Sequence, residues 1–231
     1  MKSERTIPIV KILFLRAIYL AICSQASGAQ IKIYPVDGAT ISEGEPDTVL
    51  GLSDGLSIYT DSTGITERTY FKFDLSGIPQ GQKITDAFVG IGFGYISSPE
   101  PYIEAHYLEN DDWYESTITW NNAPLDFDPN PMDTVLLDWD LEYYDYKWNV
   151  LEKTSECYSF DKTMSIVFKT DHENALIYGY GTSFWSMESN LVPEFIEGPH
   201  IMITYEEIPD PMSICFLGLG GLTLRRRRRG K

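Results

Sequence analysis

Short runs of alternating apolar and polar residues are the feature that most constrains the fold of this chain. One such run places Phe71, Phe73 and Leu75 on one face of an extended segment. Lys72 and Asp74 fall on the opposite face. A period of two is typical of a strand with one buried side, so the run predicts a half-buried β-strand.

The same kind of run recurs along the chain, separated by clusters of Gly, Pro, Asn and Asp. Predicted strands cover residues 31–34, 48–52, 68–75, 84–93, 103–108, 134–138, 164–170, 175–180 and 200–205. In the run 84–93 and just beyond it, Gly90, Gly92 and Gly94 share one face, which predicts a bulge or a close approach of another segment. Many short strands between turns predict an all-β sandwich.

One segment has a different period. Leu141, Tyr144 and Trp148 recur at spacings of three and four residues, which is typical of a helix. We therefore expect a short helix over residues 140–151, with Asp140 as its N-cap.

The beginning of the chain has the composition of an export signal. Four basic residues precede an uncharged run at 17–23, and residues 27–29 are small, as signal peptidase requires. We expect residues 1–29 to be a signal peptide and signal peptidase to be a partner. A lipoprotein signal ending at Cys23 is disfavoured, because bulky Ile22 stands where such signals need a small residue.

The end of the chain has a second targeting pattern. Pro209, Asp210 and Pro211 precede thirteen apolar or small residues, and five arginines follow, beginning with Arg225 and Arg226. A helix of thirteen residues is about 20 Å long, which is short for a bilayer core of about 30 Å. Clustered arginines stay on the cytoplasmic side of a membrane, so the preceding residues are expected outside.

This pattern resembles a PEP-CTERM sorting signal over residues 208–231, with Asp210 in place of the usual Glu. The resemblance implies a short transmembrane helix and a second partner, an exosortase-type sorting protease that cleaves the tail. The alternative is a plain C-terminal anchor. Either way, we expect an exported protein of the cell surface or extracellular matrix, anchored transiently or permanently, that meets the membrane only through this tail.

The segment between the two signals is strongly acidic. Residues 30–211 contain eight lysines and arginines against 33 aspartates and glutamates, a formal charge of −25. This charge repels nucleic acid and anionic lipid, so no nucleic-acid partner is expected. It serves either as a solubility device or for calcium-bridged contacts with surface polymers, since carboxylates are ligands of hard cations.

Residues 30–207 are expected to form a single domain. Cys157 is the one cysteine between the signals, so an internal disulfide is not expected there. About 180 residues suffice for one domain with a good hydrophobic core.

Several fragments, in order, carry a family resemblance. Residues 68–79 read R-T-Y-F-K-F-D-L-S-G-I-P, and residues 113–124 read W-Y-E-S-T-I-T-W-N-N-A-P. The second resembles the W-x-E-x-x-[IV]-T-W-N-x-x-P signature of DNRLRE-type carbohydrate-binding modules at every fixed position. Further matches lie at 84–87, 140–148, 186–188 and 199–205. Glu142 and Met187 depart from the family pattern, where Thr and Arg are usual.

The resemblance implies a jelly-roll-like antiparallel β-sandwich that binds polysaccharide without catalysis, with polyanionic sugars such as alginate among the ligands of such modules. Two alternatives are a structural or adhesive matrix component with calcium-mediated contacts and no defined sugar pocket, and a polysaccharide lyase or hydrolase. The signature residues Trp113, Glu115, Thr119 and Trp120 are interpreted as determinants of the fold, because aromatic side chains dominate core packing.

A sugar site needs an aromatic ring for stacking and polar groups for the hydroxyls. In the helical interpretation of 140–151, Tyr143 and Tyr146 face away from the buried stripe. The predicted ligand-binding residues are Trp139, Tyr143 and Tyr146, beside Asp138 and Lys147.

A calcium loop is the other candidate site. Asp126, Asp128, Asn130 and Asp133 space oxygen ligands in the opening rhythm of an EF-hand. Pro131 stands where that motif requires glycine, so the hypothesis is an irregular structural calcium site, with an ordinary solvated loop as the alternative. No zinc-type histidine pair or P-loop occurs in the sequence, and we expect no enzymatic activity.

Overall fold

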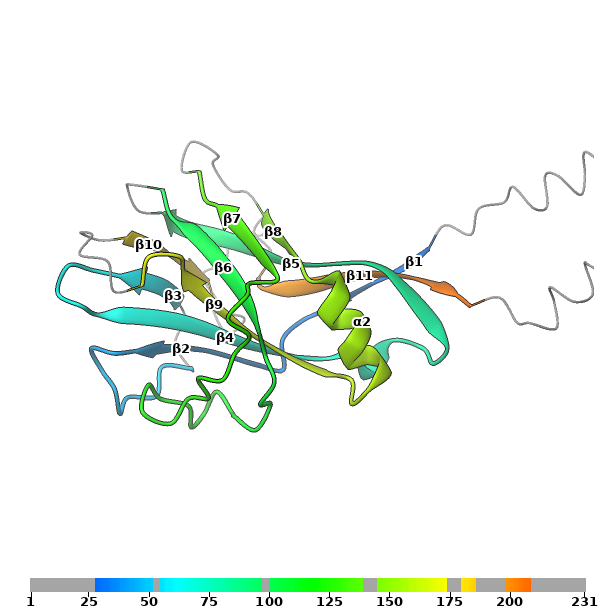
Figure 1. The fold of residues 1–231 in the computed structure, drawn as a ribbon, viewed down its shortest axis with the longest axis horizontal. Helices are drawn as coiled ribbons and strands as arrows, with labels where there is room; N and C mark the ends of the chain where they lie inside the picture. The colour runs from blue at the N-terminus through cyan, green and yellow to red at the C-terminus, as the bar shows by residue number, and fades with distance from the viewer. Residues whose placement is uncertain are drawn as a thin grey trace, which may run out of the picture.

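The protein is a sandwich of two antiparallel β-layers, as Figure 1 shows. The computed structural model describes residues 28–51, 55–96, 100–138, 145–173, 180–185 and 198–208. The all-β prediction is confirmed. The predicted signal peptide and the sorting tail lie outside the described residues, apart from the few at their inner ends, and none of the described helices has the length and apolarity to span a bilayer.

The first layer joins four strands. In order across the layer they are β1 (Ala29–Ile33), β11 (His200–Glu207), β5 (Gln82–Ile96) and β8 (Asp145–Asn149). The second layer runs through β10 (Tyr180–Trp185), β3 (Gly55–Thr60), β4 (Thr66–Asp74), β9 (Thr163–Thr170), β6 (Tyr102–Leu108) and β7 (Asp133–Leu136), with β2 (Asp37–Ser42) also on β4.

Strand β5 connects the two layers. Its first part pairs with β11 and β8, and its last residues pair with β10. The glycines of β5 were expected to mark a close approach, and Gly90 confirms it. A Cβ atom at Gly90 would lie 2.7 Å from the ring of His200 on the neighbouring strand. Glycine is therefore required there so that His200 can pack across β5.

The main core lies between the layers, where the alternating residues meet. Phe71 and Phe73 of β4 and Val89 of β5 are fully buried, as their alternation predicts. Trp148 on β8 is also fully buried. Its ring packs edge-on against Phe168 at 5.2 Å between centroids, and its Nε1 donates to the Ile103 carbonyl at 2.9 Å. The Trp148 ring therefore ties the edge of one layer to the other.

The predicted helix over 140–151 is wrong in its position. Residues 145–149 form strand β8, and the helix α2 spans Leu151–Ser159, while residues 139–144 lie outside the described residues. The reason is that Tyr146, Trp148 and Val150 alternate inward as in a strand. A strand of five residues followed directly by a helix left too few residues for either period to be recognised.

The predicted strand at 48–52 is also wrong over its described residues. Thr48 and Val49 are exposed, and the Thr48 N–H donates to the Glu45 carbonyl in a turn. Strands β2 and β3 flank this turn instead. Local β propensity did not produce a strand there because the side chains have no core to enter.

A second, smaller core covers the outer face of the second layer. The long connection 109–131 folds over β2, β4 and β9 and buries Trp113, Ile118 and Ala123 against Tyr70 and Val167. We call residues 109–131 the signature loop, because they contain the W-x-E-x-x-[IV]-T-W-N-x-x-P motif.

Lys72 holds the signature loop to the sheet. Its ammonium lies 3.0 Å from Asp37, donates to the Trp113 carbonyl, and sits 4.7 Å from the ring centroids of both Trp113 and Tyr114. Glu115 accepts a hydrogen bond from the Gly38 N–H at 3.1 Å. These contacts support the interpretation of the signature residues as fold determinants.

The turn at Thr119 and the side chain of Trp120 have structural contacts too. The Thr119 N–H donates to the Asn122 side-chain oxygen at 2.7 Å, which closes the turn. The Arg68 guanidinium lies 5.0 Å from the Trp120 ring and forms two hydrogen bonds with Glu173, at 2.6 and 2.8 Å.

Replacing Trp148 by alanine should lower the free energy of unfolding by about 3–5 kcal/mol, because the change removes a fully buried aromatic ring. Urea denaturation of the purified domain measures this loss. Phe160 is a matched control, since it is 90% exposed at the end of α2, and Phe160→Ala should change stability by about 0.5 kcal/mol or less. Equal losses in the two variants would contradict the core described above.

Candidate functional site

The edges of the two layers meet at strands β7 and β8, and side chains join them. Asp133 at the start of β7 accepts a hydrogen bond from the Asn149 N–H of β8 at 2.8 Å. The Tyr146 hydroxyl of β8 donates to the Asp138 carbonyl at 2.6 Å and accepts from the Asp138 N–H at 2.9 Å. We call this junction of β7 and β8 the seam.

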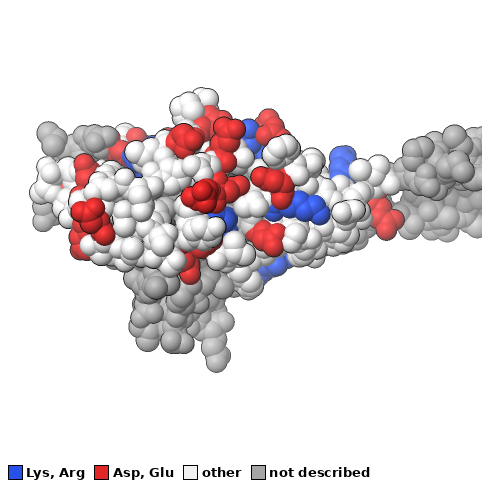
Figure 2. Space-filling view, turned by 90° about the horizontal axis from the view of Figure 1, so that it is seen from below, with Lys and Arg blue, Asp and Glu red and all other residues white. Residues whose placement is uncertain are grey.

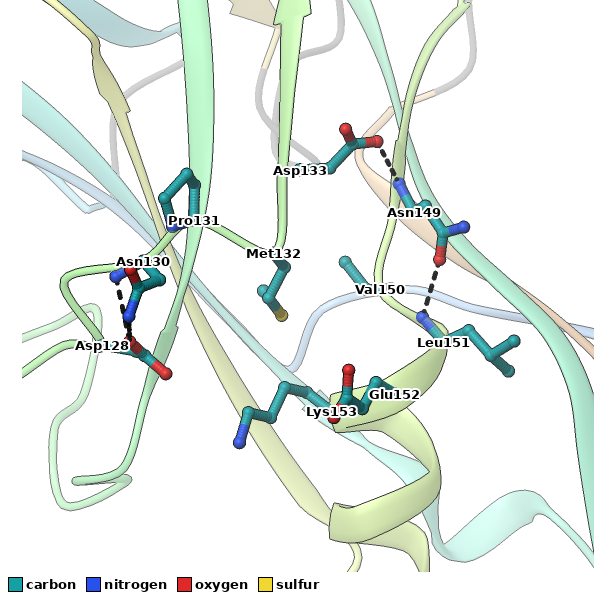
Figure 3. Close-up of a pocket in the computed structure, with 10 residues that line it drawn as sticks. All are labelled: Asp128, Asn130, Pro131, Met132, Asp133, Asn149, Val150, Leu151, Glu152 and Lys153. Atoms are coloured by element: carbon teal, nitrogen blue, oxygen red, sulfur yellow. Dashed lines mark hydrogen bonds between the residues drawn. The ribbon is translucent and has the colours of Figure 1, made fainter.

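A pocket of about 530 Å³ lies at one end of the seam, beside the first turn of α2 (Figure 3). Its volume is within the range of about 300–1,000 Å³ that is usual for small-ligand sites. The lining residues come from the end of the signature loop, the start of β7, and the junction of β8 with α2. They are Asp128, Asn130, Pro131, Met132, Asp133, Asn149, Val150, Leu151, Glu152 and Lys153.

Two groups of polar side chains face each other across this pocket. Figure 3 shows Asp128 and Asn130 on one side and Asp133 with Asn149 on another, with Met132 between them. Lys153 extends from α2 at the third side. The lining thus combines carboxylates, amides and one ammonium with an apolar floor, a combination that can bind a molecule rich in hydroxyl groups.

The charged groups of the pocket are held by their neighbours. The Asn130 N–H donates to Asp128 at 2.9 Å, and this bond, followed by the Asn130 side chain and the charge of Lys153, lowers the pKa of Asp128 below its usual value. Lys153 pairs with Glu156 at 2.9 Å, and this hydrogen bond raises the pKa of Lys153. Asp128 is therefore anionic and Lys153 cationic at neutral pH.

The local sequence explains how the chain turns from strand β8 into the first turn of α2. The Asn149 side-chain oxygen accepts from the Leu151 N–H at 3.1 Å, although Val150 is the N-cap residue. Glu152 lies in the first turn, where a carboxylate is stabilised by the helix dipole. Residues 149–153 therefore turn from strand to helix where they line the pocket.

Behind the pocket, a buried histidine anchors the signature loop. His106 on β6 is 1% exposed, and its Nδ1 donates to the Asp128 carbonyl at 2.7 Å. Its Nε2 lies 3.0 Å from Glu104, which also pairs with Lys169 on β9 at 2.5 Å. The position of Asp128 thus depends on a chain of contacts that begins on β9.

The predicted calcium residues lie partly together. Asp128, Asn130 and Asp133 line the pocket, whereas Asp126 is exposed and lies outside its lining. Across the part of the chain that the structure describes, no three His, Cys, Asp or Glu side chains gather closely enough to hold a metal ion. The calcium hypothesis for these residues stays a prediction.

The predicted sugar-binding residues are divided. Trp139 and Tyr143 lie outside the described residues, so their roles stay predictions. The expected exposure of Tyr146 is wrong, because β8 turns its ring inward and leaves it 9% exposed. Asp138 lies at the seam, and Lys147 points outward, with its ammonium 4.4 Å from the Phe88 ring centroid.

Sequence reasoning selected three of the ten lining residues and missed Pro131 and Met132. It also missed the whole junction of β8 with α2: Asn149, Val150, Leu151, Glu152 and Lys153. The cause is the misplaced helix, which placed residues 149–151 inside a regular segment. The alternation of Tyr146, Trp148 and Val150 was the signal that could have revealed a strand ending at Asn149.

Comparison with known proteins gives two findings. The model of carbohydrate-binding module family 96 matches residues 29–195. A gellan lyase of Bacillus sp. is 28% identical over 107 residues, which is 46% of this chain. The match covers 4% of the length of that lyase, so it concerns a small part of the larger protein.

Replacing Glu104 by glutamine should destabilise the domain most at neutral pH. Burial alone would raise the pKa of Glu104, but hydrogen bonds and charge from Lys169 and His106 outweigh burial and lower it. A carboxylate with a lowered pKa stabilises the fold above its unfolded pKa and loses this effect as pH falls through the folded value.

The difference in melting temperature between wild type and Glu104→Gln should therefore shrink from about pH 5 to about pH 3. Thermal melts across this range test the expectation. Exposed Glu109→Gln is the control and should follow the wild-type curve. A difference that stays constant with pH would show that the loss is one of packing rather than charge.

Proposed function

Because the chain belongs to carbohydrate-binding module family 96, we propose that its sandwich is a non-catalytic module that binds polysaccharide at the pocket beside the seam. The family match is the observation that carries this proposal, since residues 29–195 include every strand except β11. The composition of the pocket supports it, because hydroxyl-rich ligands need closely spaced donors and acceptors.

The charge of the domain narrows the ligand class. Figure 2 shows acidic side chains spread over one face of the domain and outnumbering the basic ones among them. Five of the eight lysines and arginines in residues 30–211 pair with carboxylates: Arg68, Lys72, Lys83, Lys153 and Lys169. Lys147 and Lys162 lie over the rings of Phe88 and Tyr158. We therefore infer a ligand that is uncharged, or an anionic polymer bridged by calcium.

The cellular setting is part of the proposal. The basic and uncharged start of the chain and its PEP-CTERM-like end support export to the cell surface or extracellular matrix, with signal peptidase and an exosortase-type protease as partners. Mass spectrometry of the C-terminal peptide from native cells tests the processing step. An intact arginine cluster on the mature protein would contradict cleavage by the protease.

Affinity electrophoresis against a polysaccharide panel tests the binding proposal. The panel contains neutral polymers together with alginate and gellan, the polymer in the name of the lyase relative, each with and without calcium. At least one polymer should retain the purified domain. The chain length of that polymer should stay unchanged after incubation with the domain. Retention by none would overturn the proposal, and a shortened polymer would favour a lyase or hydrolase.

Substitutions in the pocket should weaken this retention. Glu152→Ala and Lys153→Ala remove one charged contact each, so each is expected to raise the Kd about tenfold, the equivalent of about 1.4 kcal/mol. Lys83→Ala is the matched control, because Lys83 also pairs with a glutamate but lies on β5, outside the pocket lining. Equal affinities for all variants and wild type would place the sugar elsewhere.

Salt dependence separates the two ligand classes. Without calcium, retention by an anionic polymer should strengthen as salt rises from about 0.01 M to about 0.15 M, because the screening length falls from about 30 Å to about 8 Å and repulsion weakens. Retention by a neutral polymer should stay constant over the same range. Binding to an anionic polymer that weakens with salt would contradict the charge argument.

A further inference from the structure

Strands β6 and β7 carry an exposed apolar pair on the outer face of the second layer. Tyr102 is 45% exposed and Leu136 is 42% exposed, and the two residues lie directly opposite each other in the antiparallel register. Opposite side chains in such a ladder have Cβ atoms about 4.5–5.5 Å apart, so they form one patch. We call Tyr102 and Leu136 the outer patch.

Both backbone polar groups of Tyr102, the N–H and the carbonyl, are held by hydrogen bonds. The Tyr102 N–H donates to the Tyr180 hydroxyl at 2.9 Å, and this hydroxyl donates in turn to Asp171 at 2.9 Å. The Asp171 N–H donates to the Tyr102 carbonyl at 3.2 Å. The exposed ring is therefore presented from a rigid strand rather than from a loop.

A row of polar side chains lies beside the outer patch on the same face. Glu104 is two residues along β6 from Tyr102, and it lies opposite Thr134 on β7 and Lys169 on β9. The Glu104 and Lys169 side chains, 19% and 14% exposed, form an ion pair at 2.5 Å. The row thus offers a hydroxyl, a carboxylate and an ammonium with no net charge.

This arrangement matches the chemistry of a pyranose ring. One face of a pyranose presents C–H groups that pack on an aromatic ring, and its rim presents hydroxyls that donate and accept hydrogen bonds. A purely apolar partner would leave the ion pair beside the patch desolvated without new hydrogen bonds, which is unfavourable. A sugar can pack its C–H groups on the Tyr102 ring and form hydrogen bonds with the polar row through its hydroxyls.

We propose that the outer patch and the row of Thr134, Glu104 and Lys169 bind a second pyranose of the same polysaccharide. The proposal rests on the proposed function, and it adds a second contact on the strand that lines the pocket. Asp133 in the pocket precedes Leu136 by three residues on β7, which is about 10 Å of strand. An oligosaccharide that crosses this edge strand can contact both, so the module is expected to recognise stretches of polymer rather than single sugars.

The test compares two tyrosines of equal exposure. Tyr34, in the link between β1 and β2, is also 45% exposed, so Tyr34→Ala removes the same area from another part of the surface. Isothermal titration is performed with oligosaccharides of increasing length, made from the polymer that wild type retains. Tyr102→Ala should raise the Kd for long oligosaccharides about tenfold, whereas Tyr102→Phe and Tyr34→Ala should leave it unchanged within about twofold.

Oligosaccharide length supplies a second readout. Wild type should gain affinity as the oligosaccharide lengthens, and Tyr102→Ala should lose most of this gain. Thermal melts of every variant confirm folding, and Tyr102→Phe keeps the ring if Tyr102→Ala is unstable. If Tyr102→Phe fails to bind the long oligosaccharides, the Tyr102 hydroxyl rather than its ring is needed. This result would overturn the proposal that the sugar stacks on the ring.

The outcomes separate this proposal from the proposed function. If Lys153→Ala weakens binding while Tyr102→Ala matches Tyr34→Ala, the pocket binds sugar and the outer patch does not. If wild type binds none of the polymers, both proposals fall. If Tyr102→Ala instead abolishes self-association in analytical ultracentrifugation without changing sugar affinity, the patch is an interface between copies and this proposal is wrong.

Discussion

The shared strand β5 is the constraint on which the rest of the sandwich depends. Its fifteen residues pair with β11 and β8 in one layer and with β10 in the other, so its path sets the distance between the layers. Gly90 gives the room that the His200 ring needs at this crossing. Because β5 also carries the edge strand β8, the position of the seam, and hence of the pocket, follows from the position of β5.

The conspicuous motif of the signature loop has a structural role in this family member. Trp113 is 4% exposed, and its Nε1 donates to Ser165 at 3.1 Å. Its carbonyl holds the Lys72 ammonium, which would otherwise be a buried charge with fewer partners. The motif closes a second core over the sheet, and the far end of the signature loop, at Asp128 and Asn130, borders the pocket. One segment therefore both closes the second core and supplies part of the pocket lining.

The sequence predicts the parts of this molecule that depend on repeated local pattern, and it fails where contact depends on distant segments. Phe71, Phe73 and Val89 alternate over long strands, so their burial was predictable. Tyr146 was misassigned because β8 has five residues and runs directly into α2. The pocket brings residues near 130 together with residues near 150 from two different layers. Their spacing along the chain does not show that these segments are close in space. Asp128, Asn130 and Asp133 were selected as metal ligands, whereas their shared position beside Lys153 is a property of the folded state.

The pairing of β1 with β11 has a mechanical consequence. These strands run antiparallel, with Ala29 opposite Tyr205, so the domain is entered and left at the same end of the molecule, as Figure 1 shows. Tension applied to both ends at once would peel the two strands apart one hydrogen bond after another. A tether on one end alone puts no such peeling force on the pair. A domain built in this way therefore keeps β1 paired with β11 best when force reaches it through one end alone.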